Sequence, residues 1–361
     1  MRVGIDASRL RAGMSGIGRY IYNILAPLDA ELPEATFVLY ARSDFHLDLP
    51  SDRWILKRDK HPIWSRVPTV FWTHFRIAAL ARDDGLDVFW ATNTLLPARI
   101  DPVPCVATIY DLNHLLAPET MTPLTWLAYK AWFGHAVHHA AYRVAISQGT
   151  SSRLKSKFGR YADAVALPAL PLRGALPRRE DAERTLCMLG VRPPYILTVG
   201  NQEPRKNLSA AVNAVAILKS KGKLNDHTLV MAGVRGWGSS LQKDDQRIGS
   251  EWIIPLGYVD DETLVALYML ADAFVFPSIY EGYGIPVGEA LAYGCPVVAT
   301  DMPELRESGG PGVIYVTPTP KDVAHGLDIV LAKPRPQPML PAHDWSAAAK
   351  VMGDAFRRVA Y

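Results

Sequence analysis

The chain has 361 residues, of which 49% are apolar and 21% charged, with a formal net charge of +3. This composition excludes a disordered or collagen-like chain, and a balance so close to neutral argues against a nucleic-acid partner. The three cysteines are odd in number and widely spaced, which argues for a reducing compartment and against a disulfide scaffold or zinc site.

The length indicates about two domains. No apolar run approaches the roughly 20 residues of a membrane-spanning helix, and Asp6 stands where a signal peptide would need apolar residues. We therefore expect a cytoplasmic protein.

The first half of the chain alternates short apolar runs with helical patterns. The runs predict strands at residues 2–7, 36–40, 54–56, 87–90, 103–109 and 143–146. A helix is expected to begin near Gly18, and longer helical patterns cover 64–82 and 122–141. Such alternation is typical of βαβ units and a parallel sheet.

Five prolines interrupt residues 168–194, which we interpret as a connection between domains. The alternation then restarts, with strands expected at 195–199, 228–232, 252–255, 273–276 and 296–299, and helices at 207–221, 260–271, 286–293 and 345–359. The expected fold class is α/β, with two doubly wound domains facing each other across a cleft. We place the domains at 1–170 and 171–343, and expect the final helix, 344–361, to pack back on the first.

Three loops carry residue types suited to a phosphorylated ligand. Gly16-Ile17-Gly18 opens a helix after the first strand, where backbone N–H groups can approach an anion. A third glycine at dinucleotide-binding spacing is missing, and a tight turn explains the motif equally well. Arg205 and Lys206 follow Gly200 at a strand–helix junction and suit a diphosphate, with Asn207 as the helix N-cap. The alternative is a solvated pair of charges.

The third loop is the most specific. Glu281 and Glu289 flank a loop with Gly282 and Gly284, and Pro286 occupies the first turn of the following helix. An ionised carboxylate accepts both protons of a vicinal diol, while the amides suit phosphate.

These motifs resemble those of the retaining nucleotide-sugar glycosyltransferases of family four, which have the GT-B architecture of two Rossmann-like domains. The resemblance is carried by Ser15-Gly16-Ile17-Gly18-Arg19-Tyr20, Thr108-Ile109-Tyr110-Asp111-Leu112, Glu203-Pro204-Arg205-Lys206-Asn207 and the pair Glu281 and Glu289. Within the family, the chain is most similar to bacterial mannosyl- or rhamnosyltransferases of surface-polysaccharide and lipopolysaccharide assembly.

The resemblance also implies roles for residues. It assigns the nucleotide and its diphosphate to Gly16, Gly18, Gly200, Arg205, Lys206 and Glu289, and the donor sugar with its phosphate to Glu281, Gly282, Tyr283 and Gly284. Glu281, Arg205, Lys206 and Asp111 are the expected catalytic residues, although Asp111 equally suits a helix cap. Tyr110 and Asn201 depart from the family pattern, which more often has histidine and arginine there.

The implied reaction moves a hexose, expected to be mannose from GDP-mannose, to a hydroxyl of a glycan or lipid-linked acceptor. The chain has no Asp-x-Asp pair, so we expect no metal and no cofactor. Aromatic and basic residues around Trp64, Trp72 and Trp132 suggest peripheral contact with the inner face of a membrane, although core packing explains the tryptophans equally well. Two alternatives stay open: a nucleotide-sugar epimerase on the same fold, and a non-catalytic sugar-nucleotide-binding subunit.

Overall fold

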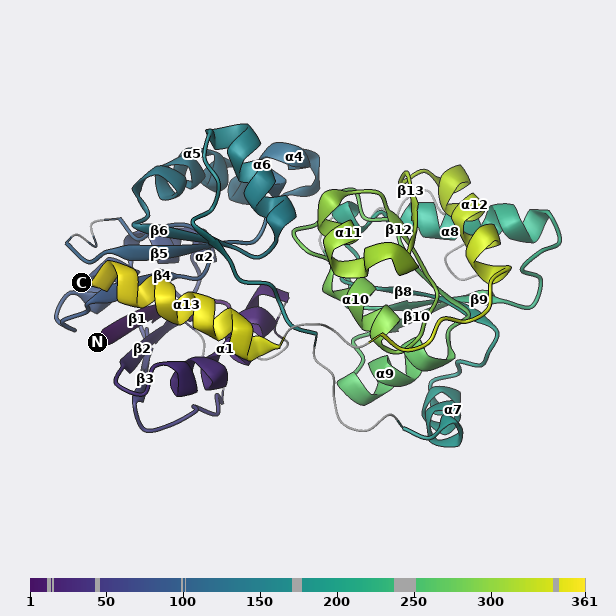
Figure 1. The fold of residues 1–361 in the computed structure, drawn as a ribbon, viewed down its shortest axis with the longest axis horizontal. Coiled ribbons are helices and arrows are strands. Elements are labelled where there is room, and N and C mark those ends of the chain that lie inside the picture. Colours follow the sequence, from purple (N-terminus) through teal and green to yellow (C-terminus); the bar gives the residue numbers. More distant parts are fainter. Residues whose placement is uncertain are drawn as a thin grey trace. The chain divides into compact units, whose positions relative to one another are not determined.

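A computed structural model describes residues 1–11, 14, 16–42, 46–98, 100, 102–170, 177–236, 251–339 and 344–360. The chain divides into two compact units, one of Met1–Ala169 with His343–Tyr361 and one of Leu170–Ala342. Each unit holds one parallel sheet with helices packed against it (Figure 1). The α/β fold class is thus confirmed. Residues 171 and 343, at the expected boundaries, lie outside the described residues.

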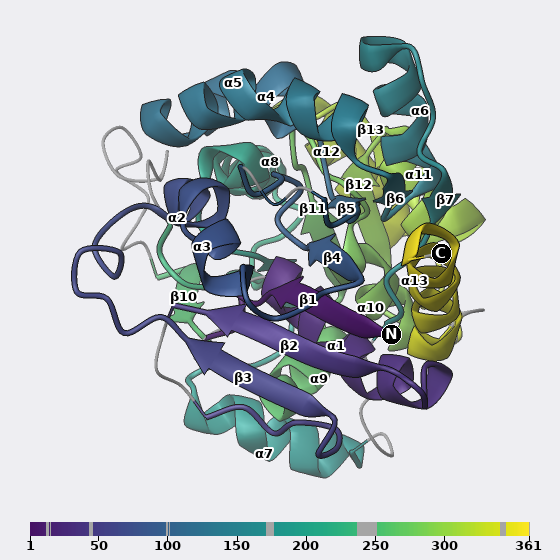
Figure 2. The same cartoon turned by 90° about the vertical axis from the view of Figure 1, so that its left-hand side faces the viewer.

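The first sheet has seven strands in the order β3-β2-β1-β4-β5-β6-β7. Their bounds are β1 Arg2–Asp6, β2 Thr36–Ala41, β3 Trp54–Arg58, β4 Val88–Ala91, β5 Cys105–Ile109, β6 Tyr142–Ala145 and β7 Ala164–Val165. Figure 2 shows β3, β2 and β1 side by side, with Asp6 in register with Tyr40. The central strands are apolar and buried because helices cover both faces of the sheet.

The helices of the first unit are α1 Gly16–Glu31, α2 Thr69–Phe75, α3 Ile77–Ala81, α4 Asn113–Leu116, α5 Pro123–His139, α6 Gln148–Phe158 and α13 Trp345–Ala360, with a 3₁₀ turn at Pro118–Thr120. Helix α13 packs against α1, where Arg357 Nη1 lies 2.7 Å from Glu31 Oε1. Its Phe356 ring contacts the ring of Trp90.

The prediction of one helix over 64–82 is wrong. Helix α2 begins only after Pro68, whose extended backbone (φ −54°, ψ 144°) ends any helical run before it. A break at Arg76 then separates α2 from α3.

The second sheet has six strands in the order β10-β9-β8-β11-β12-β13. Their bounds are β8 Tyr195–Val199, β9 Thr228–Ala232, β10 Ile253–Gly257, β11 Ala273–Phe276, β12 Val297–Thr300 and β13 Ile314–Val316. Helices α8 Leu208–Ser220 and α12 Pro320–Leu331 share one core cluster with the sheet, and α7 Arg179–Met188, α9 Asp261–Leu270, α10 Ile285–Ala292 and α11 Pro303–Gly309 share the other. Short 3₁₀ turns lie at Pro204–Lys206 and Gly310–Gly312.

The division between the two units, at Ala169 and Leu170, falls within the predicted connection 168–194, but helix α7 in the same range belongs to the second unit. This helix buries only Ala182 and Leu186 in the core, and its remaining positions are largely charged or exposed. Two buried positions are too few to give a recognisable apolar period. Residues 171–176 lie outside the described part of the chain. None of the helices in the described ranges has both the length and the apolar character needed to cross a membrane.

Both sheets begin in the middle and grow outward to either side. The strand order therefore reverses between β1 and β4 in the first sheet, and between β8 and β11 in the second. Ligands of doubly wound sheets bind outside the carboxyl ends of the strands at such a reversal. The two places to search are thus the loops after β1 and β4, and those after β8 and β11.

Gly233, directly after β9, should tolerate no side chain. Its φ is +143°, and a Cβ there would lie 2.1 Å from the carbonyl oxygen of Gly200. We expect Gly233→Ala to lower the free energy of unfolding by about 3 kcal/mol, from left-handed strain and overpacking together. Urea denaturation measures this.

The matched control is Gly222→Ala, where φ is +73° but no atom lies within 4 Å of the added carbon. This variant should lose only about 1–2 kcal/mol of strain. Equal losses in the two variants would contradict the role given to the close approach of Gly233 and Gly200.

Candidate functional site

One carboxylate and two cations meet at the reversal of the second sheet. Glu281 Oε1 lies 2.7 Å from Lys206 Nζ, and Glu281 Oε2 lies 2.7 Å from Arg205 Nη1. The carboxylate is buried, with 9% of its side chain exposed, and the two cationic side chains are 18% and 13% exposed. The structure therefore brings together three of the four predicted catalytic residues.

Two loops from neighbouring strands hold these side chains. Arg205 and Lys206 lie in the 3₁₀ turn after β8, and Glu281 lies between β11 and α10. The backbone N–H of Ile279 donates to the Arg205 carbonyl at 2.8 Å, and Arg205 Nη1 donates to the Tyr280 carbonyl at 2.7 Å. The ion pairs are thus part of a wider link between the loops.

Asn207 stands at the N-cap position of α8, as predicted, but its side chain does not cap the helix. Its amide Nδ2 instead donates to the carbonyls of Pro277 and Pro318, at 3.1 and 2.9 Å. The backbone of Asn207 is left-handed, with φ +50°, which asparagine tolerates better than most residues. Asn207 therefore joins three loops rather than closing its own helix.

The electrostatics of the cluster favour a bound anion. Burial raises the pKa of Glu281, but the charges of Arg205 and Lys206 outweigh it and bring the pKa to about 2. Burial lowers the pKa of Lys206, whose ammonium also lies 4.7 Å from the ring centre of Phe276. Two cations share one carboxylate, so these three side chains carry one net positive charge.

Glu289 lies in α10 and is also buried, but it is not part of this ion-pair cluster. Its Oε2 accepts a hydrogen bond from the Tyr268 hydroxyl at 3.1 Å. Helix α10 begins after Gly284, whose φ is +93°, and Pro286 lies in its first turn, as predicted. Gly282 and Tyr283 are buried in the loop between the two glutamates.

Two glycines, Gly200 and Gly284, allow close packing in the loops that hold the site residues. Gly200 has φ +144°, and a Cβ there would approach the Lys206 Cε to 3.2 Å. A Cβ at Gly284 would lie 2.2 Å from Leu305 Cδ2. Sequence reasoning named both glycines but missed Tyr268 and Phe276, because neither belongs to a recognisable motif.

The other predicted site residues lie in the first unit. Gly16 and Gly18 begin α1, and a Cβ on Gly18 would lie 2.6 Å from the Arg9 carbonyl oxygen, so packing alone demands that glycine. Asp111 Oδ1 accepts the N–H of Asn113 at 3.0 Å in a turn just before α4, whose N-cap position is Leu112, so Asp111 is not the helix cap. Ser15 lies outside the described residues.

A polar cluster, of which sequence reasoning singled out only Tyr110, lies at the reversal of the first sheet. Asn93 Oδ1 accepts from Arg9 Nε at 3.1 Å, and the Tyr129 hydroxyl lies 3.4 Å from the same oxygen. Asn93 Nδ2 and the Tyr110 hydroxyl are buried and have no partner among the described residues. Burial raises the pKa of Tyr110 well above its usual value, so this hydroxyl stays protonated and can donate. The signal available in the sequence was the position of Arg9, Asn93 and Tyr110 after predicted strands, whereas Tyr129 comes from helix α5.

The aromatic residues assigned to a membrane contact include core residues. Trp72 is fully buried and donates to Asp59 Oδ2 at 2.8 Å, and Trp132 stacks on His74 with ring centres 4.2 Å apart. His135 and His139 stack on the exposed side of α5. Among the residues that the structure describes, no group of three or more His, Cys, Asp or Glu side chains has the arrangement of a metal site.

The low pKa of Glu281 makes the contribution of its ion pairs to stability depend on pH. A carboxyl with a folded pKa of about 2, against about 4.3 in the unfolded chain, stabilises the fold above the unfolded value, and this is lost as the pH falls toward 2. We expect the difference in unfolding free energy between the wild type and Glu281→Gln to be constant above about pH 5.5 and to shrink between about pH 5 and 3. Urea denaturation across this range measures it.

Glu262→Gln, in the exposed first turn of α9, is the matched control, because it removes the same charge where no ion pair is present among the described residues. A difference between wild type and Glu281→Gln that persists undiminished at pH 3 would contradict the assigned ion pairs.

The sequence of the unit that holds this site is similar to a known protein family. Residues 189–352 match the family model of group 1 glycosyl transferases. The chain is 30% identical over 259 residues to O-antigen chain mannosyltransferase B of Escherichia coli, covering 69% of this chain and 66% of that protein. It is 25% identical over 282 residues to the serotype-specific mannosyltransferase WbdA of the same species, covering 70% of this chain but 34% of WbdA. The chain thus spans just under two thirds of the first relative and about a third of the second.

Solved structures share the fold across the whole chain. WaaG, described as a glycosyltransferase of lipopolysaccharide biosynthesis, superimposes with a TM-score of 0.70 at 15% identity, covering 98% of this chain and 95% of WaaG. Sucrose-phosphate synthase from Thermosynechococcus elongatus gives 0.69 at 16% identity, covering 100% and 94%. The two Rossmann-like sheets are those of the GT-B fold. Residues 189–352, which hold Glu281, Arg205 and Lys206, therefore form a group 1 glycosyl transferase domain, and the chain is similar to bacterial O-antigen mannosyltransferases.

Proposed function

We propose that this protein is a retaining, metal-independent glycosyltransferase that moves mannose from GDP-mannose to a hydroxyl of a glycan or lipid-linked acceptor in bacterial surface-polysaccharide synthesis. The observation that carries the proposal is the half-buried pair of cations, Arg205 and Lys206, that share the buried Glu281 carboxylate at the strand reversal of the second sheet. The mannosyltransferase activity named for its relatives supports the choice of donor sugar. The solved structure of Anabaena HepE contains UDP and glucose on the same fold, at a TM-score of 0.66, which supports a nucleotide sugar as the ligand class.

In this proposal the donor diphosphate binds to Arg205 and Lys206 and competes with the Glu281 carboxylate for them. Glu281 is then free to accept a hydrogen bond from the donor sugar. Glu289 accepts from the ribose hydroxyls of the nucleotide, and the backbone of Gly200 and of residues 282–284 lies against the phosphates. Gly16, Gly18 and Asp111 are further proposed contacts from the first unit.

In this proposal Arg205 and Lys206 stabilise the negative charge that develops on the leaving group. Charge develops on the departing diphosphate, and fixed cations in a site shielded from water stabilise it strongly. Enzymes lower barriers by roughly 8–23 kcal/mol, whereas one helix terminus supplies about 2 kcal/mol at most. The start of α10 therefore cannot suffice without Arg205 and Lys206. We also propose that the enzyme acts in the cytoplasm, in peripheral contact with the inner face of the membrane.

The direct test is incubation of the purified protein with GDP-mannose, with and without a lipid or glycan acceptor fraction. A transferase releases GDP and forms a mannoside only when acceptor is present, and NMR of the product reads the retained anomeric configuration. Conversion of the donor without acceptor would favour an epimerase. Donor binding with no turnover on any acceptor fraction would favour a non-catalytic subunit.

Turnover should survive chelation of divalent metals. The reason is that Arg205 and Lys206 are available to neutralise the leaving diphosphate, which is the task of a metal in many nucleotide-sugar enzymes. We expect mannosyl transfer in excess EDTA to stay within about twofold of the untreated rate. Loss of all activity in EDTA, followed by recovery with manganese, would rule out this mechanism.

Substitution of Glu289 should mainly weaken GDP binding, whereas substitution of Glu281 should mainly lower kcat. Glu289→Gln should weaken GDP binding about tenfold to a hundredfold, because hydrogen bonds to a charged group contribute about 1.5–3 kcal/mol. Glu281→Gln should bind GDP at least as tightly as the wild type, because the competing carboxylate is gone, while kcat falls by orders of magnitude. Calorimetry with GDP and steady-state kinetics measure both.

Tyr268→Phe serves as the control, since it removes the hydrogen bond to Glu289 but keeps the carboxylate. Its loss of GDP affinity should be smaller than that of Glu289→Gln. The assignment is wrong if Glu281→Gln loses GDP affinity as severely as Glu289→Gln.

A further inference from the structure

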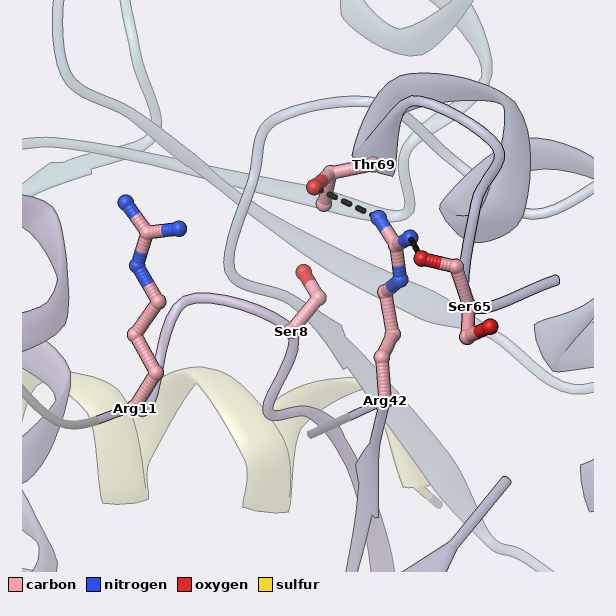
Figure 3. A pocket seen from close by; sticks show the side chains of 5 residues that line it. All are labelled: Ser8, Arg11, Arg42, Ser65 and Thr69. Atoms are coloured by element: carbon pink, nitrogen blue, oxygen red, sulfur yellow. Dashed lines mark hydrogen bonds between the residues drawn. The ribbon is translucent and has the colours of Figure 1, made fainter. Parts of the chain in front are cut away.

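A pocket of about 350 Å³ lies at the carboxyl edge of the first sheet, lined by Ser8, Arg11, Arg42, Ser65 and Thr69. Ser8 follows β1 and Arg42 follows β2, and these neighbouring strands are held in register up to Asp6 and Tyr40. Figure 3 shows the Arg11 and Arg42 side chains on either side of Ser8, whose hydroxyl points into the space between them. The pocket size is at the small end of the range for small-molecule sites, roughly 300–1,000 Å³.

Arg42 is fixed firmly in one wall of the pocket. Its Nη1 donates to Thr69 Oγ1 at 2.8 Å, and its Nη2 lies within 3.0 Å of the carbonyl oxygens of Trp64, Ser65 and Val67. All four partners are neutral, and no carboxylate lies within ion-pair distance of Arg42 among the described residues. A guanidinium has five N–H donors, so Nε and part of Nη1 are still available to a ligand.

Neither arginine of the pocket forms an ion pair with a carboxylate among the described residues. Arg11 is exposed and makes no hydrogen bond or ion pair with the described residues. Burial lowers the pKa of Arg42, and the charges of Arg9 and Arg11 lower it further, whereas the charges of Asp59 and Asp6 raise it. The nearby Asp59 is already paired with Arg76, at 3.1 Å.

The Ser8 hydroxyl offers a further donor to a ligand. Ser8 is 6% exposed, and its Oγ makes no well-aligned hydrogen bond with the described residues, although it lies near the Asp6 carboxyl and opposes the rise that burial causes in the pKa of Asp6. A buried hydroxyl that is poorly hydrogen-bonded costs free energy, which a bound ligand can recover. The backbone N–H of Ser8 donates to Asp6 Oδ1 at 2.9 Å, which fixes the turn and holds the hydroxyl toward the arginines.

We propose that this pocket binds a phosphate or diphosphate group carried by the acceptor substrate. Two arginines and a serine hydroxyl offer donors from several directions, which suits the several oxygens of a phosphate better than the two of a carboxylate. Binding of the phosphate group stands on the pocket alone, whereas its assignment to the acceptor rests on the proposed function. In that assignment the donor diphosphate occupies Arg205 and Lys206 in the other unit, and this pocket recognises a second, separate phosphate.

The test is calorimetric titration of inorganic diphosphate into the full chain carrying Lys206→Ala, which weakens the proposed nucleotide site. Arg11→Gln in this background should raise the dissociation constant about tenfold or more, because it removes a charge-assisted contact. Ser8→Ala should raise it severalfold. Arg11 is exposed and has no partner among the described residues, so its variant should fold normally, whereas Arg42→Gln also removes the anchor of residues 64–69.

Arg66→Gln is the matched control, an exposed arginine near the pocket that does not line it. It should leave the affinity for inorganic diphosphate unchanged. Equal affinities of the Lys206→Ala protein with and without Arg11→Gln, or an equal loss with Arg66→Gln, would reduce the pocket to a site for an adventitious ion only.

Two further titrations assign the source of the phosphate. Farnesyl diphosphate, as a mimic of a lipid-linked acceptor, should lose affinity with Arg11→Gln as inorganic diphosphate does. GDP binding to the chain with Lys206 intact should be unaffected by Arg11→Gln. A tenfold loss of GDP affinity would give the pocket to the donor and overturn the acceptor assignment. If GDP did not bind the wild type at all, the proposed function would fail while the effect of Arg11 on inorganic diphosphate could still be observed.

Discussion

The carboxylate of Glu281, shared between Arg205 and Lys206, is the interaction on which the second unit's ligand edge depends. These cations follow β8 and the carboxylate follows β11, and the strand order reverses between those strands. Helices α8 and α10 then leave toward opposite faces of the sheet, so the two loops diverge unless something holds them. Removing one partner of a buried ion pair costs about 3–5 kcal/mol. The charged side chains of the site therefore also stabilise the fold, because they hold the loops after β8 and β11 together.

The same interaction explains how the ligand edge of the second sheet can be stable when no ligand is bound. An unpaired buried cation is costly, and two adjacent ones are more so. Glu281 reduces that cost while leaving one net positive charge, so a more highly charged anion can displace it. The first sheet has a different solution: Arg42 is held by neutral oxygens and Arg11 lies toward solvent. Among the described residues, the cations of the second sheet's edge are thus paired with a carboxylate, whereas Arg42 and Arg11 are not.

The parallel strands were the easiest part of the fold to predict. Strands β8, β9 and β11 match the predicted ranges because a strand covered on both faces is a continuous apolar run, ended sharply by polar or turn-forming residues. Helix α7 was missed because only Ala182 and Leu186 are buried in the core. The break at Arg76 was missed because both α2 and α3 continue the same apolar pattern.

The sequence motifs alone predict that Arg205, Lys206 and Glu281 serve one ligand, and the three residues lie together because they follow adjacent strands. The ion pairs themselves were not predicted, since the sequence does not show which way a side chain turns. Tyr268 reaches Glu289 from a helix 21 residues earlier, and no local pattern marks it. The pocket of Ser8, Arg11 and Arg42 arises from separate segments, so only the folded chain reveals it.

Helix α13 gives the first unit a discontinuous sequence, with consequences for biosynthesis. Its Phe356 packs on Trp90, and its Arg357 pairs with Glu31, yet the whole of the second unit lies between these partners in the chain. A ribosome that has just finished the first unit's seven strands has not yet made the helix that covers one of their faces. That apolar surface stays uncovered while about 175 further residues are translated, at roughly 5–20 residues per second. For this interval the nascent sheet offers chaperones a binding surface that the finished protein no longer has.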